Sequence, residues 1–305
     1  TIVVLVACAL FASLVNPPPP SAAQDGAGAV GRPPEWRSRA SLPGSGTYRG
    51  VALGDIDRDG DLDLAAAGDG GLQVWEGDGT GSWTVRTGPT AASTYEDVAL
   101  ADVDRDGALD IVAAGDAGVR LWKGNGAWAW SPGTPPLDGG TFHAVAVHDI
   151  DLDGDPDVVA GGEAGIRVRL NDGTGGWTRA SDPVPTGTWY DLAIGDFNID
   201  GMPDVAGAGN DSAAPNGTLR TFLGDGAGGW PASATVASGL DGPFHGVATA
   251  DVNGDGRPDL CGARIGGVHY WSGDGVNAWS PGPSPASDHG HRALLLGDMD
   301  HDGRA

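Results

Sequence analysis

The residues with the clearest chemistry in this sequence are aspartates crowded into short loops. The first loop reads DIDRDGDLD over residues 55–63, with five aspartates in nine positions. Carboxylates held within ~5 Å of one another repel by about 3 kcal/mol per pair at an effective dielectric near 20. A hard divalent cation relieves that repulsion, and Ca²⁺ accepts about six to eight oxygen ligands in irregular geometry. The loop therefore predicts a calcium site, unless the segment is disordered.

The same loop recurs five more times along the chain. Its copies begin at residues 102, 149, 196, 251 and 298, so the spacings from residue 55 onward are 47, 47, 47, 55 and 47. Positions 1, 3 and 5 are expected to direct oxygens to one centre, position 9 to complete the ligand shell, and Gly at position 6 to allow the sharp turn. The expected ligands are Asp55, Asp57, Asp59 and Asp63; Asp102, Asp104, Asp106 and Asp110; Asp149, Asp151, Asp153 and Asp157; Asp196, Asn198, Asp200 and Asp204; Asp251, Asn253, Asp255 and Asp259; and Asp298, Asp300 and Asp302.

The loops differ from one another in two respects. The fourth and fifth have Asn at position 3, which keeps an oxygen but removes a charge, so weaker binding is expected there, and the sixth lacks its closing residue. An EF-hand is an alternative, but it needs Glu at position 12 and flanking helices, whereas position 12 from Asp55 is Ala66. Each loop joins two adjacent strands, so the ions are expected to rigidify the fold rather than to meet a substrate.

The elements that must position these loops are short apolar runs. In the first unit they cover residues 48–54, 62–68, 71–77 and 83–87, and they are separated by Gly, Asp, Asn or Pro. Four such runs per unit predict a four-stranded antiparallel sheet. A tryptophan begins the fourth run of each complete unit, at Trp83, Trp130, Trp177, Trp230 and Trp279. Units of this size stacked radially give a β-propeller, so the predicted fold class is all-β.

The D-x-[DN]-x-D-G-x-x-D loop after an apolar strand, with a GDGTG-type turn further on, resembles the FG-GAP and VCBS repeat family, which includes the propeller of integrin α subunits. The resemblance covers residues 36–305 and implies that position 7 adds a backbone carbonyl to the ion. It also implies seven blades, whereas this chain holds five complete units and partial first and last ones. We therefore expect the propeller to be truncated at its C-terminus and the sequence to be part of a longer chain.

The N-terminal segment and the cysteines bear on the cellular location of the protein. Residues 1–23 resemble a signal peptide or hydrophobic leader, residues 24–35 form a Pro/Gly-rich linker, and an extracellular or cell-surface location is expected. Lipidation at Cys8 is an alternative fate of the leader. Cys261, the second of only two cysteines, is expected to be a small buried residue, and no disulfide framework is possible.

Composition limits the partners. The chain has 17 basic and 41 acidic side chains and a formal net charge of −24, which disfavours nucleic acid and anionic membrane surfaces. No membrane span is expected within the propeller, because the apolar run of residues 1–15 lies outside it and is short for a bilayer.

A ring of aromatic residues is the first candidate ligand site. Seven residues before each acidic loop stand Tyr48, Tyr95, Phe142, Trp189, Phe244 and His291. These rings could stack on sugars or hold a protein side chain, and their arrangement resembles the aromatic cup of the integrin propeller; the alternative is core packing between blades. The next position varies from blade to blade, as expected of an exposed surface, and holds Arg49, Glu96, His143, Tyr190, His245 and Arg292.

The predicted function is that of a calcium-binding propeller that acts in adhesion or recognition of carbohydrate or extracellular protein ligands. Two alternatives remain: the propeller domain of a secreted enzyme, such as a polysaccharide lyase or phosphodiesterase, and a structural spacer in a large surface protein. No nucleophile elbow, HExxH motif or P-loop occurs in the sequence, which disfavours an enzyme.

Overall fold

The computed structural model describes residues 42–44, 46–89, 93–212, 214–238, 242–283, 294 and 296. The expected leader and linker, the sixth acidic loop with Asp298, Asp300 and Asp302, and His291 lie outside these residues. The described residues contain no helix long and apolar enough to span a membrane.

The described chain folds into five antiparallel sheets, each made of four consecutive strands, as predicted. Blade one contains β1 (Tyr48–Gly54), β2 (Asp63–Gly68), β3 (Gly71–Gly77) and β4 (Trp83–Arg86), and blade two β5 (Tyr95–Ala101), β6 (Asp110–Gly115), β7 (Gly118–Gly124) and β8 (Trp130–Pro132), with the short β9 (Leu137–Asp138) added to β7. Blade three contains β10 (Phe142–His148), β11 (Asp157–Gly162), β12 (Gly165–Asn171) and β13 (Trp177–Arg179). Blade four contains β14 (Thr188–Gly195), β15 (Asp204–Asp211), β16 (Ala214–Leu223) and β17 (Ala232–Ser238), and blade five β18 (Phe244–Ala250), β19 (Asp259–Arg264), β20 (Gly267–Gly273) and β21 (Trp279–Pro281).

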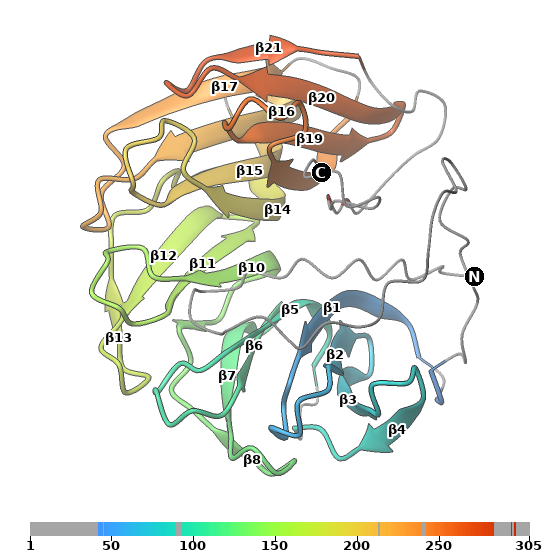
Figure 1. Cartoon of the computed structure of the whole chain (residues 1–305). Helices are drawn as coiled ribbons and strands as arrows, with labels where there is room; N and C mark the ends of the chain where they lie inside the picture. Colours follow the sequence, from blue (N-terminus) through green and yellow to red (C-terminus); the bar gives the residue numbers. More distant parts are fainter. Residues whose placement is uncertain are drawn as a thin grey trace, which may run out of the picture.

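The five sheets follow one another around an arc (Figure 1). The first strands of neighbouring blades contact one another in the order β1, β5, β10, β14, β18, whereas the fourth strands lie at the periphery. The first strand of each blade is therefore the innermost. This arrangement is that of a β-propeller, and it confirms the predicted all-β fold class.

The blades are held together by apolar residues on both faces of each sheet. Every residue of the second strands β2, β6 and β11 is buried. Between blades one and two, Ile56 and Val74 pack with Ile111 and Trp122 in one cluster, and similar clusters fill the following interfaces. A single blade cannot bury both of its faces, so its stability depends on its neighbours.

The tryptophans that begin the fourth strands also connect neighbouring blades. The indole N–H of Trp177 donates to the carbonyl oxygen of Thr134 in the preceding blade at 2.9 Å. Trp130 and Trp230 make the equivalent bonds to the carbonyls of Thr87 and Ser181. In blades two to four the repeated Trp thus links the outer edge of one blade to the one before it, whereas the Trp279 indole donates to Asn277 of its own blade.

Candidate metal centres

Each acidic loop joins the first strand of a blade to the second. In the loop between β1 and β2, Arg58 at position 4 has φ 67° and Gly60 at position 6 has φ 93°. The left-handed region is accessible to Gly and unfavourable for Arg, so the loop accepts strain at position 4. The same pair of positive φ values occurs in loops two to four. With left-handed backbone at positions 4 and 6, the loop curls so that the side chains of positions 1 and 3 come close to that of position 9.

The first three loops bring carboxylates together as expected. One oxygen from each of positions 1, 3 and 9 lies within 4.8 Å of the others in every one of these loops. The groups are Asp55, Asp57 and Asp63; Asp102, Asp104 and Asp110; and Asp149, Asp151 and Asp157.

The remaining expected ligands are placed differently. Asp59, at position 5, clusters with Asp57 and Glu76 of β3, whereas Asp106 and Asp153 at the same position join no group of three carboxylates in the described structure. Loops four and five have Asn198 and Asn253 at position 3, so positions 1, 3 and 9 hold two carboxylates and one amide there rather than three carboxylates.

The ninth residue has a role that the sequence did not reveal. Both oxygens of Asp157 accept backbone hydrogen bonds at 2.8 Å, one from Ile150 in the loop and one from Asn171 at the end of β12. The equivalent residues Asp63, Asp110, Asp204 and Asp259 are bonded in the same way. Burial raises the pKa of Asp157 to about 6, although these two backbone bonds oppose the shift. The ninth residue therefore links the loop to the third strand, whether or not it also contacts an ion.

Three buried oxygens show that the loops fit a cation. Asp102 Oδ1, Asp149 Oδ1 and Asp151 Oδ1 are buried and accept no hydrogen bond. An unpartnered buried carboxylate oxygen is costly, and each of these residues belongs to one of the three-carboxylate groups. A hard divalent cation with oxygen ligands would satisfy all three oxygens.

Neighbouring loops also contact one another. Arg105 Nε of loop two lies 2.6 Å from Asp155 Oδ1 of loop three. The Trp128 indole of blade two donates to Asp57 Oδ2 of loop one at 3.0 Å, whereas Lys123 Nζ, at the end of β7, lies 3.1 Å from Asp104 Oδ2 of its own blade. A bound ion would therefore stiffen contacts between blades as well as the hairpin that holds it.

The expected aromatic ring lies at the opposite end of the inner strands, and its members are mostly buried. Tyr95 is 3% exposed, Phe142 6%, and Trp189 and Phe244 0%. Most pack edge-on against a ring of their own blade: Tyr95 on Trp122, with centroids 5.6 Å apart, is one example. This position agrees with the core-packing alternative and leaves these four rings covered.

The next residue of each inner strand forms a row around the axis. The pairing register shifts at this point in every blade, so Arg49, Glu96, His143, Tyr190 and His245 are bulged out of the ladder. Arg49 Nη1 donates to Glu96 Oε1 at 2.9 Å. The ring centroids of His143 and Tyr190 lie 5.3 Å apart, and those of Tyr190 and His245 4.8 Å apart. We call these five residues the bulge row; bulges re-aim side chains and are common beside functional sites.

Two aspartates lie one residue deeper than the bulge row and escaped the sequence interpretation. Asp97 Oδ2 accepts from the Val145 N–H of the next blade at 2.9 Å, and Asp191 Oδ2 from that of Val247 at 2.8 Å. Burial raises the pKa of Asp97 to about 6 and that of Asp191 to about 7, and the charge of Asp97 adds to the second shift. A charged residue inside an otherwise apolar inner strand is the signal that could have identified them.

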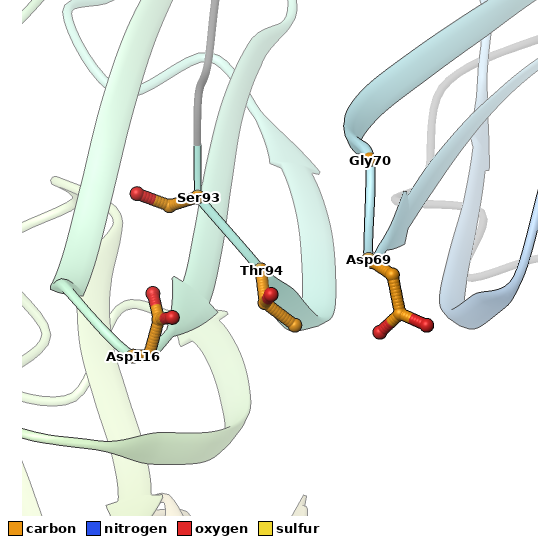
Figure 2. Close-up of a pocket in the computed structure, with 5 residues that line it drawn as sticks. All are labelled: Asp69, Gly70, Ser93, Thr94 and Asp116. Atoms are coloured by element: carbon orange, nitrogen blue, oxygen red, sulfur yellow. The ribbon is translucent and has the colours of Figure 1, made fainter.

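A small hollow lies beside the bulge row, between blades one and two. Its volume is ≈ 280 Å³, and it is lined by Asp69, Gly70, Ser93, Thr94 and Asp116. Figure 2 shows Asp69 and Asp116, from equivalent turns of the two blades, on either side of Ser93 and Thr94. Its lining offers carboxylate and hydroxyl groups at the end of the propeller that carries the bulge row.

Cys261 is buried in β19, in agreement with its expected role as a small core residue. Burial, with a smaller contribution from Asp259, raises the pKa of its thiol to about 11. The thiolate needed for nucleophilic chemistry is therefore disfavoured.

Comparisons with solved structures support this fold. The chain is similar to a lectin from Agrocybe aegerita, whose structure is described as the basis of specific recognition of non-reducing terminal N-acetylglucosamine, with 24% identity and a TM-score of 0.55 over 77% of this chain. It is also similar to BBS1N in complex with ARL6DN, with 14% identity and a TM-score of 0.50 over 77% of this chain. The chain spans 65% of the lectin and 66% of BBS1N, slightly less than two thirds of each.

The sequence itself was compared with known families and proteins. No curated protein sequence matches the chain. The model of the FG-GAP-like repeat, in contrast, matches residues 55–113, 102–160, 149–207 and 196–262, which together make up more than half of the chain. The chain therefore belongs to the FG-GAP-like repeat family.

Proposed function

We propose that this chain is an extracellular, calcium-stabilised binding module, and that its carbohydrate or protein ligand binds at the end of the propeller opposite the acidic loops. The bulge row carries the proposal. It is the place where the innermost strands of all five blades bulge at the same position, and where the bulged side chains differ in chemistry.

Calcium is the cation that the loops suit best. The donors are carboxylate and amide oxygens in an irregular nine-residue turn, and Mg²⁺ demands a stricter octahedron than such a turn offers. The unpartnered buried oxygens of Asp102, Asp149 and Asp151 support an ion in loops two and three. An extracellular location supplies Ca²⁺ at the concentrations that modest sites need, since extracellular modules bind it with Kd values of about 10⁻⁴–10⁻³ M.

The chemistry of the bulge row suits a polar ligand with apolar faces. His143, Tyr190 and His245 form a continuous row of rings, which could stack on a sugar ring or a protein side chain. Arg49 and Glu96 beside them offer a donor and an acceptor, although they are paired with each other in the free protein. The likeness to a lectin fold makes saccharides a reasonable first class of probe.

The test is binding of the full chain, in Ca²⁺, to arrays of glycans and of extracellular matrix proteins, followed by calorimetry on each ligand found. Tyr190→Ala removes the central ring of the row and should weaken binding about tenfold or more, whereas Tyr190→Phe should retain most of the affinity. Ile199→Ala is the matched control, because Ile199 is 55% exposed at the acidic-loop end of the same blade. Equal affinity of Tyr190→Ala and the wild type, or no ligand on either array, would contradict the proposal.

A further inference from the structure

One position of blade three departs from the repeat. In the other blades the third strand places a large aromatic residue opposite the second strand, and Trp75, Trp122, Phe222 and Trp271 occupy this position. In blade three the residue opposite Val158 is Arg169. Its side chain is only 17% exposed, so an arginine replaces an aromatic residue in a largely covered place.

Arg169 is one of three arginines around a single carboxylate. Arg167 Nη1 lies 2.8 Å and Arg179 Nη2 2.6 Å from Asp182 Oδ2, and Arg169 Nη1 lies 3.8 Å from Asp182 Oδ1. The Asp182 side chain is 4% exposed. Arg167 and Arg169 come from β12, and Arg179 from β13, where it pairs directly with Arg169. We call these three residues the arginine triad.

The triad carries uncompensated positive charge. In the part of the chain that the structure describes, each other ion-paired base has at least one carboxylate of its own. In the arginine triad, three guanidinium groups share one carboxylate, that of Asp182. Burial lowers the pKa of Arg169; Asp182 opposes this shift, while Arg179 and Arg167 add to it. Two net positive charges therefore lie together in a chain whose formal net charge is −24.

The ion cluster is also incomplete. Asp182 Oδ1 is buried and accepts no hydrogen bond, and Arg169 Nη1 donates to the carbonyl of Val168 at 2.7 Å. Arg169 is thus held in place by the backbone without being committed to Asp182, and Arg179, 69% exposed, reaches the solvent beside it.

We propose that Arg167, Arg169 and Arg179 bind an oxyanion group, a carboxylate or a sulfate, of a small acidic ligand. Planar guanidinium groups present paired N–H donors that match the oxygens of such groups. A second anionic partner would also relieve the repulsion between the arginines. The strong negative charge of the whole chain opposes long polyanions, which favours a single acidic group or a short oligosaccharide that carries one. The triad lies on the outer strands β12 and β13, so this site is separate from the bulge row.

The test uses the full calcium-loaded chain and calorimetric titration at constant ionic strength with sodium sulfate, with glucuronate, and with acidic and neutral oligosaccharides of equal length. Arg169→Trp restores the aromatic residue of the other blades, and Arg179→Gln removes an exposed member without disturbing the core. Arg120→Gln is the matched control, because Arg120 occupies the register of Arg167 in blade two and is paired with Asp138 at 2.9 Å.

Both triad variants should lose affinity for the anion by about tenfold or more, the effect of one lost charge-assisted hydrogen bond. Arg120→Gln should bind as the wild type does. Tighter binding of the acidic oligosaccharide than of free sulfate or glucuronate identifies a saccharide as the source of the group, and equal binding identifies the free anion. No saturable binding by the wild type, or unchanged affinity in Arg179→Gln, overturns the proposal. Tyr190→Ala should leave anion binding unchanged. The proposal for the bulge row and the proposal for the arginine triad can therefore be refuted independently of each other.

Discussion

Replacing Asp151 with asparagine is expected to stabilise the ion-free protein and to reduce the stabilisation that calcium adds. Asp151 occupies position 3 of the third loop, and its Oδ1 is buried without a hydrogen bond. Burial, together with the charges of Asp153 and Asp149, raises its pKa. In the ion-free protein the charge on Asp151 is thus unfavourable, whereas in the calcium-bound protein it is expected to be a ligand.

The size of the effect follows from the distances within the cluster. One oxygen of Asp151 lies within 4.8 Å of those of Asp149 and Asp157, and each such pair repels by about 3 kcal/mol at an effective dielectric near 20. Relaxation and partial protonation reduce this, so we expect Asp151→Asn to stabilise the ion-free protein by about 1–3 kcal/mol. With calcium present, a tenfold loss of affinity at this site removes about 1.4 kcal/mol of linked stability.

The assay is thermal unfolding of the wild type and the variant, each in excess EDTA and in excess Ca²⁺. The wild type should melt at a lower temperature in EDTA. The variant should melt above the wild type in EDTA, and this advantage should shrink by about 1.4 kcal/mol in Ca²⁺, with shifts of about 2–4 °C for each kcal/mol. Glu163→Gln is the control, because it deletes one negative charge from an exposed turn of the same blade and should shift both melts alike.

Two results would refute this reasoning. If Asp151→Asn lowers the melting temperature equally in EDTA and in Ca²⁺, the side chain has a structural role unrelated to an ion. If the wild type melts at the same temperature in both conditions, the acidic loops contribute no calcium-linked stability.

Two further predictions concern the contacts between blades. Trp177→Phe keeps the ring but removes the N–H that donates to Thr134, and should cost about 0.5–1.5 kcal/mol in the free energy of unfolding. An unchanged free energy of unfolding, measured by denaturant titration, would contradict the linking role. The folded pKa of Asp191, about 7, lies above its ordinary value of 3.8, so its contribution to stability is complete below pH ~4 and is lost as the pH rises through ~7. Asp191→Asn should flatten the decline of the free energy of unfolding across this range, measured by denaturant titration, and an unchanged slope would show that the group does not titrate there.

Much of the fold was predictable because the repeat shows its own boundaries. The runs 48–54 and 71–77 coincide with β1 and β3, since glycines and aspartates bound every apolar run. The three-carboxylate groups of loops one to three were also predictable, because ligand spacing within nine residues is a local property of the chain. The second function of Asp157 was hidden, because its partner Asn171 belongs to a different strand.

The sites on the opposite end of the propeller were less accessible to sequence reasoning. The rings of Tyr95 and Phe244 had two interpretations, and only packing against Trp122 and Trp271 distinguishes them. The bulge row depends on a shift in the pairing register of the first two strands of each blade, and no residue type in the sequence indicates that shift. Aligning the third strands of the repeats could have identified Arg169. Its sharing of Asp182 with two other arginines could not be predicted in this way, because it depends on the path of the chain after β13.

The sequence by itself determined the features that depend on local order: the strand lengths, the 47-residue period, the acidic loops and the radial stacking that such units require. The tertiary structure decided which side chains remain available once the blades pack. Burial, the contacts between neighbouring inner strands and the sharing of one carboxylate by three bases involve residues far apart in the chain. Their energies arise from excluding water and bringing charges together, and neither of these is a property of a short stretch of sequence.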